Sequence, residues 1–198
     1  MKLTVPNILT LTRIAVIPLF VLVFFLPFDW ARPISAAIFA IAAFTDWLDG
    51  YLARKLEQTS RFGAFLDPVA DKLMVAVTLI LLVVSEPTAW LALPAIVIIG
   101  REIAISALRE WMAEIGERTQ VAVSYIGKIK TVGQMLALLL LLYSAPIGDF
   151  PTYDVGLVLL YIAVVLTLWS MVIYLNAAWP ALMGKEIDNN DENNGSSA

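Results

Sequence analysis

The chain has 198 residues, of which 60% are hydrophobic and only 15% are charged, and its mean hydropathy is +0.82. Soluble domains rarely carry so much apolar sequence, so the composition predicts a protein embedded in a lipid bilayer. The sequence contains no cysteine and no histidine, which excludes disulfides, thiolate or imidazole metal ligands, and a histidine general base. Any metal site must therefore use oxygen ligands, which favour magnesium, manganese or calcium.

The formal net charge of −4 arises at the C-terminal end of the chain. Residues 186–198 contain four acidic residues in a stretch rich in Asn, Ser and Gly, and such a composition is typical of disorder. We therefore expect a transmembrane domain over residues 1–184, followed by a disordered polar acidic tail over residues 185–198.

Six apolar segments follow one another along the chain, and each is long enough to cross a hydrocarbon core of about 30 Å as a helix. They lie near residues 8–27, 33–55, 62–84, 89–112, 121–144 and 153–179. The predicted fold is an all-α, polytopic membrane protein with six transmembrane helices. Pro68 falls inside the third segment, and we expect a helix that starts near Ser60 and tolerates this proline as a kink.

The basic residues predict the orientation of these segments. If the N-terminus is cytoplasmic, twelve of the thirteen Lys and Arg residues lie on or near the inside and only Arg32 lies outside. This bias is the one expected of cytoplasmic ends, and it places the C-terminus inside as well. We then expect an aromatic belt at the outer interface, formed by Trp30, Trp90, Tyr143 and Tyr153.

Four carboxylates interrupt the apolar pattern between the second and third segments. They are Asp46, Asp49, Asp67 and Asp71. An acid at mid-membrane costs about 2.5 to 3.5 kcal/mol, and less near the interface, so a group of four needs positive charge nearby.

The spacing of these acids indicates how they meet. Asp46 and Asp49 share one helix face, and Asp67 and Asp71 share a face of the next helix with Gly63. Two facing helices would present all four carboxylates to one point, which predicts a divalent-cation site with room for two ions. The alternative is a structural cluster of ion pairs in which the acids are neutralised by Arg54, Arg61 and Lys72.

From Asp46 to Asp71 the sequence reads D-x-x-D-G-x-x-A-R-x8-G-x3-D-x3-D. This pattern resembles the signature of the CDP-alcohol phosphotransferase family, which are integral membrane enzymes with six transmembrane helices. The similarity extends to most of the chain before the acidic tail. It includes Pro6-Asn7-x-x-Thr10-x-x-Arg13, Arg101-Glu102, Arg109-Glu110-Trp111 and Gly127-Lys128-x-Lys130-Thr131.

The resemblance implies a role for each residue of the motif. Asp46, Asp49 and Asp67 would be metal ligands for two Mg²⁺ or Mn²⁺ ions, and Asp71 would be the general base and also contact the second metal. The CDP group would lie along Gly50, Arg54 and Gly63, with Asn7 and Thr10 as further candidates. The family also implies a homodimer.

The implied reaction transfers the phosphatidyl group of CDP-diacylglycerol to the primary hydroxyl of sn-glycerol 3-phosphate and releases CMP. An alcohol needs a base to take its proton as the new bond forms, and a carboxylate must serve because histidine is absent. We expect the site at the cytoplasmic face of a bacterial inner membrane. The candidates for holding the acceptor phosphate are Arg101, Arg109, Lys128 and Lys130, although each basic residue could instead serve topology or lipid headgroups.

Two other functions compete with this hypothesis. Within the family, the acceptor could be inositol phosphate, serine or a second phosphatidylglycerol, because the shared motif does not separate these alcohols. From another class, a cation transporter could use intramembrane carboxylates to bind its ion. The sequence disfavours a transporter, because its second half does not repeat the first and the acids gather near one interface.

Overall fold

The computed structural model describes residues 5–55, 61–115 and 125–183, and this part of the chain forms six helices. The helices are α1 (Val5–Phe24), α2 (Ala31–Lys55), α3 (Arg61–Ser85), α4 (Ala89–Glu114), α5 (Tyr125–Tyr143) and α6 (Thr152–Leu182). Among the described residues the only β-structure is a single bridge between Ile147 and Phe150. The prediction of an all-α chain with six helices is confirmed. The tail predicted over residues 185–198 lies outside the described ranges.

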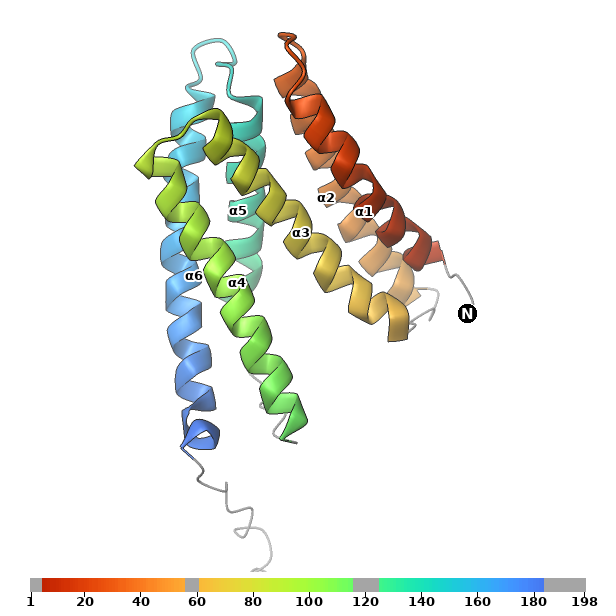
Figure 1. The fold of residues 1–198 in the computed structure, drawn as a ribbon, viewed down its shortest axis with the longest axis vertical. Helices are drawn as coiled ribbons and strands as arrows, with labels where there is room; N and C mark the ends of the chain where they lie inside the picture. Colours follow the sequence, from red (N-terminus) through yellow and green to blue (C-terminus); the bar gives the residue numbers. More distant parts are fainter. Residues whose placement is uncertain (1–4, 56–60, 116–124, 184–198) are drawn as a thin grey trace, which may run out of the picture.

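The six helices form one bundle, and the three described connections, which join α1 to α2, α3 to α4 and α5 to α6, lie at its upper end (Figure 1). Helices α1 and α2 lie side by side, α3 packs against α1, and α5 and α6 form a second closely packed pair. Helix α4 contacts both α3 and α6, while α2 also reaches α5. In Figure 1, α3 and α4 diverge downward from the turn that connects them. Residues from α1, α2 and α3 can therefore meet on one side of the bundle, and residues from α4, α5 and α6 on the other.

The core is built from large apolar side chains that all six helices contribute. Their most deeply buried members are Phe20, Phe39, Leu79, Leu82, Ile98, Leu138, Leu141, Leu142 and Leu160. Many other large apolar side chains are exposed, among them Leu22, Trp90 and Val132. An apolar exterior around an apolar core is the pattern of a protein whose surface meets lipid instead of water.

Four of the described helices are long and apolar enough to cross a membrane. These spans are Asn7–Phe24, Phe65–Ser85, Ala89–Glu114 and Thr152–Trp179, and α5 has a shorter apolar part, Lys130–Tyr143. Helix α2 has 25 residues, which is enough length, but its C-terminal half carries the acidic motif. A crossing by α2 and α5 therefore stays a prediction.

Helix α3 begins at Arg61 and continues through Pro68 to Ser85. The predicted start near Ser60, with the proline inside the helix, is confirmed. This matters for the site, because Gly63, Asp67 and Asp71 then lie four residues apart along one continuous helix.

Candidate active site

A buried arginine of α1 joins the carboxylates of two other helices. The Arg13 Nη1 atom donates a hydrogen bond to Asp46 Oδ1 of α2 at 2.6 Å and to Asp71 Oδ1 of α3 at 3.0 Å. The Arg13 side chain is 1% exposed, whereas those of Asp46 and Asp71 are 33% and 42% exposed. The guanidinium thus lies behind the two carboxylates and draws them together.

The same face of α1 also holds the third described carboxylate. Thr10 lies one helical turn before Arg13, is fully buried, and donates its hydroxyl to Asp67 Oδ1 at 2.6 Å. Asn7 is buried one further turn back. Thr10 and Arg13, one turn apart on α1, therefore bond Asp67 and Asp71, which lie one turn apart on α3.

The structure brings Asp46, Asp67 and Asp71 to one side of the bundle, where Thr10 and Arg13 of α1 bond them. Gly63 is buried one turn before Asp67. The side chains of Asp49 and Arg54, and the surroundings of Gly50, lie outside what the structure describes. Among the described side chains, which do not include that of Asp49, no group of three acids is gathered closely enough to hold one metal ion.

The donor chemistry of this cluster nevertheless fits a divalent cation. All its ligand candidates are carboxylates, which suit hard ions such as Mg²⁺ and Mn²⁺. Asp46 and Asp71 share the buried Arg13 guanidinium, and Asp67 accepts from the neutral Thr10 hydroxyl. The cluster therefore keeps an excess of negative charge that a bound cation would offset.

Among the described side chains, the basic residue that pairs with the acids is not one of the three that the ion-pair alternative predicted. The structural alternative assigned Arg54, Arg61 and Lys72 to neutralise them, but Lys72 instead contacts the hydroxyl of Ser106 on α4. The side chains of Arg54 and Arg61 are outside the described part. The observed partner, Arg13, was not predicted as a site residue, although an arginine inside an apolar span is a signal of function.

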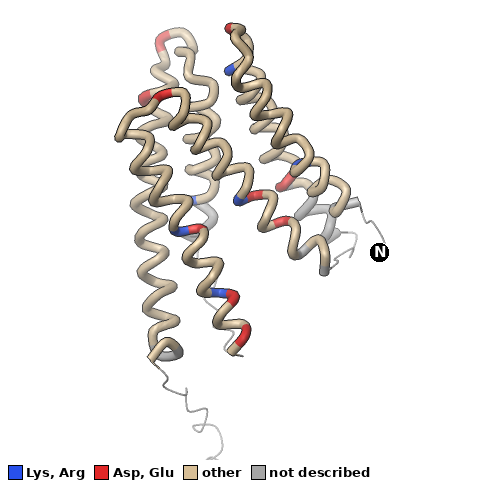
Figure 2. Tube along the Cα trace, viewed as in Figure 1, with Lys and Arg blue, Asp and Glu red and all other residues tan. Residues whose placement is uncertain are grey.

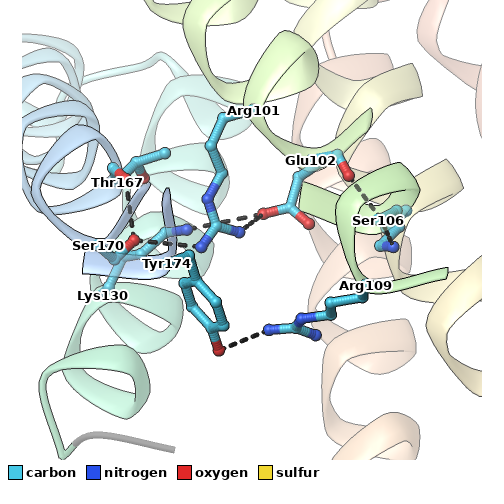
Figure 3. A network of polar contacts seen from close by, with 9 residues as sticks. Arg101, Glu102, Ser106, Arg109, Lys130, Thr167, Ser170 and Tyr174 are labelled. Atoms are coloured by element: carbon cyan, nitrogen blue, oxygen red, sulfur yellow. Dashed lines mark hydrogen bonds and ion pairs between the residues drawn. The ribbon is translucent and has the colours of Figure 1, made fainter. Parts of the chain in front are cut away.

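A second polar cluster lies between α4, α5 and α6 (Figure 3). Arg101 Nη1 donates to Glu102 Oε1 at 2.7 Å, and Arg101 Nη2 donates to Ser170 Oγ at 3.1 Å. Lys130 Nζ lies 3.6 Å from the same oxygen of Glu102. The structure therefore brings Arg101 and Lys130 together on the carboxylate of Glu102.

Arg109 extends this cluster toward the end of α4. Its Nη2 atom donates to the hydroxyl of Tyr174 on α6 at 2.6 Å, and its guanidinium lies 4.8 Å from the centre of that ring. Lys128, the fourth predicted phosphate ligand, has no described side chain. Sequence reasoning missed Ser170 and Tyr174, because neither is charged and α6 is apolar on all sides.

The two clusters open into one cavity of about 340 Å³. Asp67 and Asp71 line one side of it, and Glu102 and Lys130 line another. Lys72 lines the cavity as well, so a molecule of a few heavy atoms in it can meet carboxylates and ammonium groups together.

Comparison with known proteins shows the family of the chain. Residues 3–169 match the family model described as CDP-alcohol phosphatidyltransferase. A protein of Yersinia pestis is 57% identical over 186 residues, covering 92% of this chain and 99% of its own length. Relatives from Pectobacterium atrosepticum and Sodalis glossinidius are 58% and 57% identical over 178 residues, covering 90% of this chain and 96% of theirs. All three are named CDP-diacylglycerol–glycerol-3-phosphate 3-phosphatidyltransferase. The chain belongs to the CDP-alcohol phosphatidyltransferase family.

Proposed function

We propose that this chain transfers the phosphatidyl group of CDP-diacylglycerol to the primary hydroxyl of sn-glycerol 3-phosphate, forming phosphatidylglycerophosphate and releasing CMP. The observation that carries this function is the extent of the similarity. More than half of the aligned residues are identical over nine-tenths of the chain, in relatives that are named for this reaction. Phospholipid synthesis also suits a protein whose helices are apolar enough to lie in a membrane.

The shared cavity supports the choice of acceptor. Glycerol 3-phosphate has a hydroxyl that reacts and a phosphate that must be held. Asp71 lines the cavity on the side of the acids, and Lys130 supplies positive charge on the other side. Arg101 adds to this positive charge, because it pairs with Glu102, which Lys130 also contacts. We assign the acceptor phosphate to Arg101, Arg109, Lys128 and Lys130.

The CDP-activated lipid is assigned to the carboxylate side of the cavity. We propose that its diphosphate and cytidine lie along Gly50, Arg54 and Gly63, with Asn7 and Thr10 in the same region. Gly63 is buried beside this cluster, and a residue without a side chain lets a bulky substrate approach the backbone. Thr10 has a second role, because its hydroxyl holds the Asp67 carboxylate.

Divalent-metal dependence is general in this family. We propose Asp46, Asp49, Asp67 and Asp71 as ligands for two Mg²⁺ or Mn²⁺ ions. Metal bound there would neutralise the diphosphate and polarise its phosphorus–oxygen bonds.

Asp71 is proposed as the general base. The hydroxyl oxygen of glycerol 3-phosphate forms a bond to the lipid-side phosphorus as the bond from that phosphorus to the CMP oxygen breaks, and Asp71 takes the hydroxyl proton. One oxygen of Asp71 accepts from Arg13, so the guanidinium fixes the carboxylate while the group lines the cavity. The chain's part in the reaction is then to position both substrates and to accept one proton.

The protein is proposed to lie in the bacterial inner membrane, with all six helices crossing it, both termini in the cytoplasm and the site open to the cytoplasm. The soluble acceptor can then reach the cavity while the acyl chains of the other substrate stay in the bilayer. We also propose a homodimer.

A test of the function is CMP release by detergent-purified protein given CDP-diacylglycerol and one alcohol at a time. We expect release with glycerol 3-phosphate and much less with inositol phosphate, serine or phosphatidylglycerol. Preferred use of another alcohol would reassign the acceptor, and absence of CMP release with every alcohol would contradict a phosphatidyltransferase.

A further inference from the structure

Tyr174 of α6 contacts Arg101 and Arg109 of α4, the two arginines that are proposed to hold the acceptor phosphate. Its hydroxyl accepts a hydrogen bond from Arg109 at 2.6 Å. The centre of its ring lies 4.8 Å from the Arg109 guanidinium carbon and 5.9 Å from that of Arg101. Figure 3 shows the tyrosine between the two arginines, with its hydroxyl directed at Arg109.

This arrangement overcomes a repulsion between like charges. Arg101 and Arg109 are eight residues apart on α4, so their backbones are separated by about 12 Å along the helix axis. Two long cationic side chains at that spacing would extend away from each other. The negative face of an aromatic ring attracts both guanidinium groups, and the phenol oxygen adds an acceptor for one of them. Tyr174 thus draws both cations toward α6.

A second observation indicates that the cluster is built for a ligand. The side chain of Arg101 is only 9% exposed, yet its Nε atom is buried with no hydrogen-bond partner in the described part of the chain. Thr167 is fully buried one turn before Ser170, and its hydroxyl is also without a partner there. Buried polar groups are normally satisfied, so unmatched groups at a cationic cluster are consistent with an anion that completes the network.

We propose that Tyr174 is a positioning residue that holds Arg101 and Arg109 in the geometry that binds the phosphate of the acceptor. This inference rests on the proposed function, because it assumes that the cluster binds glycerol 3-phosphate. Tyr174 does not contact the reacting atoms. Its loss should therefore weaken acceptor binding and leave the lipid substrate and the chemical step nearly unchanged.

The test compares Tyr174→Phe and Tyr174→Leu with wild type in CMP release. Phenylalanine keeps the ring face and removes the acceptor for Arg109, so the KM for glycerol 3-phosphate should rise about three- to tenfold. Leucine removes both contacts and should raise it about ten- to thirtyfold. The KM for CDP-diacylglycerol and kcat should stay within about twofold of wild type. Calorimetric titration of glycerol 3-phosphate should show the same order of weakening.

Tyr161→Phe is the matched control. Tyr161 lies on the same helix and donates its hydroxyl to the main-chain oxygen of Trp90 at 3.2 Å, away from the basic cluster. This variant should leave both KM values unchanged. Arg101→Ala is the positive control and should raise the KM for glycerol 3-phosphate about ten- to a hundredfold.

The outcomes separate this inference from the proposed function. If wild type releases no CMP with glycerol 3-phosphate, the function itself is wrong. If wild type is active and the Tyr174 variants keep its acceptor KM, or lose affinity equally for both substrates, only the role of Tyr174 is wrong. If Tyr174→Leu does not fold, the KM of Tyr174→Phe for glycerol 3-phosphate alone decides the role of Tyr174.

Discussion

The Arg13 guanidinium is almost removed from solvent and lies between carboxylates that belong to two other helices. A buried charge is tolerated only when it is paired and hydrogen-bonded. Arg13 meets this condition with Asp46 and Asp71, and its own helix supplies Thr10 for Asp67. One face of α1 therefore sets the positions of three acids on which the proposed chemistry depends.

Replacing Arg13 with Ala should destabilise the protein, because Asp46 and Asp71 would lose the cation that they share. We expect a loss of about 2 kcal/mol, below the 3–5 kcal/mol typical of a fully buried pair, because both carboxylates are partly exposed. Thermal unfolding in detergent measures this. Arg32→Ala is the control, because Arg32 lies 3.9 Å from Glu86 in a more exposed pair and should cost much less. Equal losses in the two variants would mean that Arg13 is an ordinary ion-pair partner.

Asp46 and Asp71 share one guanidinium and are both proposed as metal ligands, but only Asp71 is also proposed as the base, so their Asn variants should fail differently. An amide oxygen binds a hard cation more weakly than a carboxylate. Asp46→Asn should therefore weaken metal-dependent binding of CDP-diacylglycerol together with turnover, and extra Mg²⁺ should partly restore both. Asp71→Asn should keep more lipid-substrate affinity than Asp46→Asn and lose turnover by about 10²- to 10⁴-fold, because the amide cannot accept the hydroxyl proton.

The deciding measurement is binding of CDP-diacylglycerol to both variants across a Mg²⁺ titration, beside single-turnover rates. Wild-type protein treated with EDTA and then resupplied with Mg²⁺ or Mn²⁺ is the reference, and its activity should be lost and then recovered. Normal turnover of Asp71→Asn, or equal rescue of both variants by metal, would show that Asp71 is not the base.

The acids of the site could be predicted from the sequence because their spacing is local. Asp67 and Asp71 lie one turn apart on α3, and any helix through them places both on one face. The partners of these acids could not be predicted in the same way. Arg13, Ser170 and Tyr174 reach the site only through the packing of α1 and α6 against other helices, and no local pattern encodes that packing.

At the scale of helices, α5 and α6 approach each other closely at Gly156. A Cβ atom at this position would lie 3.0 Å from Leu141 Cγ and 3.2 Å from the Leu141 main-chain nitrogen. The second contact is with backbone, which cannot move without shifting the helix. Small residues that let backbones approach are the usual means of joining helices in membranes, where apolar side chains gain nothing by leaving lipid.

Gly156→Ala should therefore separate α5 from α6 and lower the stability of the protein. Overpacking by a methyl group costs about 1–3 kcal/mol, and the helix propensity of alanine offsets about 1 kcal/mol of this, so the expected net loss is up to about 2 kcal/mol. Gly133→Ala, on α5, is the control, because no heavy atom lies within 4 Å of an added Cβ there. That variant should be neutral or slightly stabilising, since alanine favours a helix over glycine. Thermal unfolding of both variants in detergent checks the contrast, and equal stability would contradict tight packing at Gly156.

The extents of the helices were predictable because their apolar runs are long and end at clear breaks. The start of α3 was the hardest boundary to predict, since Pro68 could have been the first residue of the helix instead of lying inside it. The four-residue spacing of Gly63, Asp67 and Asp71 predicted the longer helix, and the structure has it. The pairing of helices was not predictable, because an apolar helix that faces lipid on one side and protein on the other has no marked amphipathic stripe.

The charges of the whole molecule are unevenly distributed along the bundle. In Figure 2 they appear at the connections at the upper end and in the lower half of the helices, with a largely uncharged zone between them. The polar cavity lies with the lower group, since Asp67, Asp71 and Lys130 line it. A zone without charges is what a hydrocarbon core requires, and the lower end is then the side on which a soluble acceptor reaches the site.

The direction in which the bundle crosses the membrane can be tested directly, because the chain has no cysteine and a single introduced thiol is labelled without background. The excess of Lys and Arg at the lower end predicts that this end is cytoplasmic. Asp29→Cys, between α1 and α2, and Asp149→Cys, between α5 and α6, should react with a membrane-impermeant maleimide in spheroplasts, whose outer membrane has been removed. Glu114→Cys, at the end of α4, should react only after the inner membrane is permeabilised. Because Asp29 and Asp149 lie in different connections, they test the upper end of the bundle twice. Labelling of Glu114→Cys in intact spheroplasts would reverse the orientation and would place the site on the side that glycerol 3-phosphate from the cytoplasm does not reach.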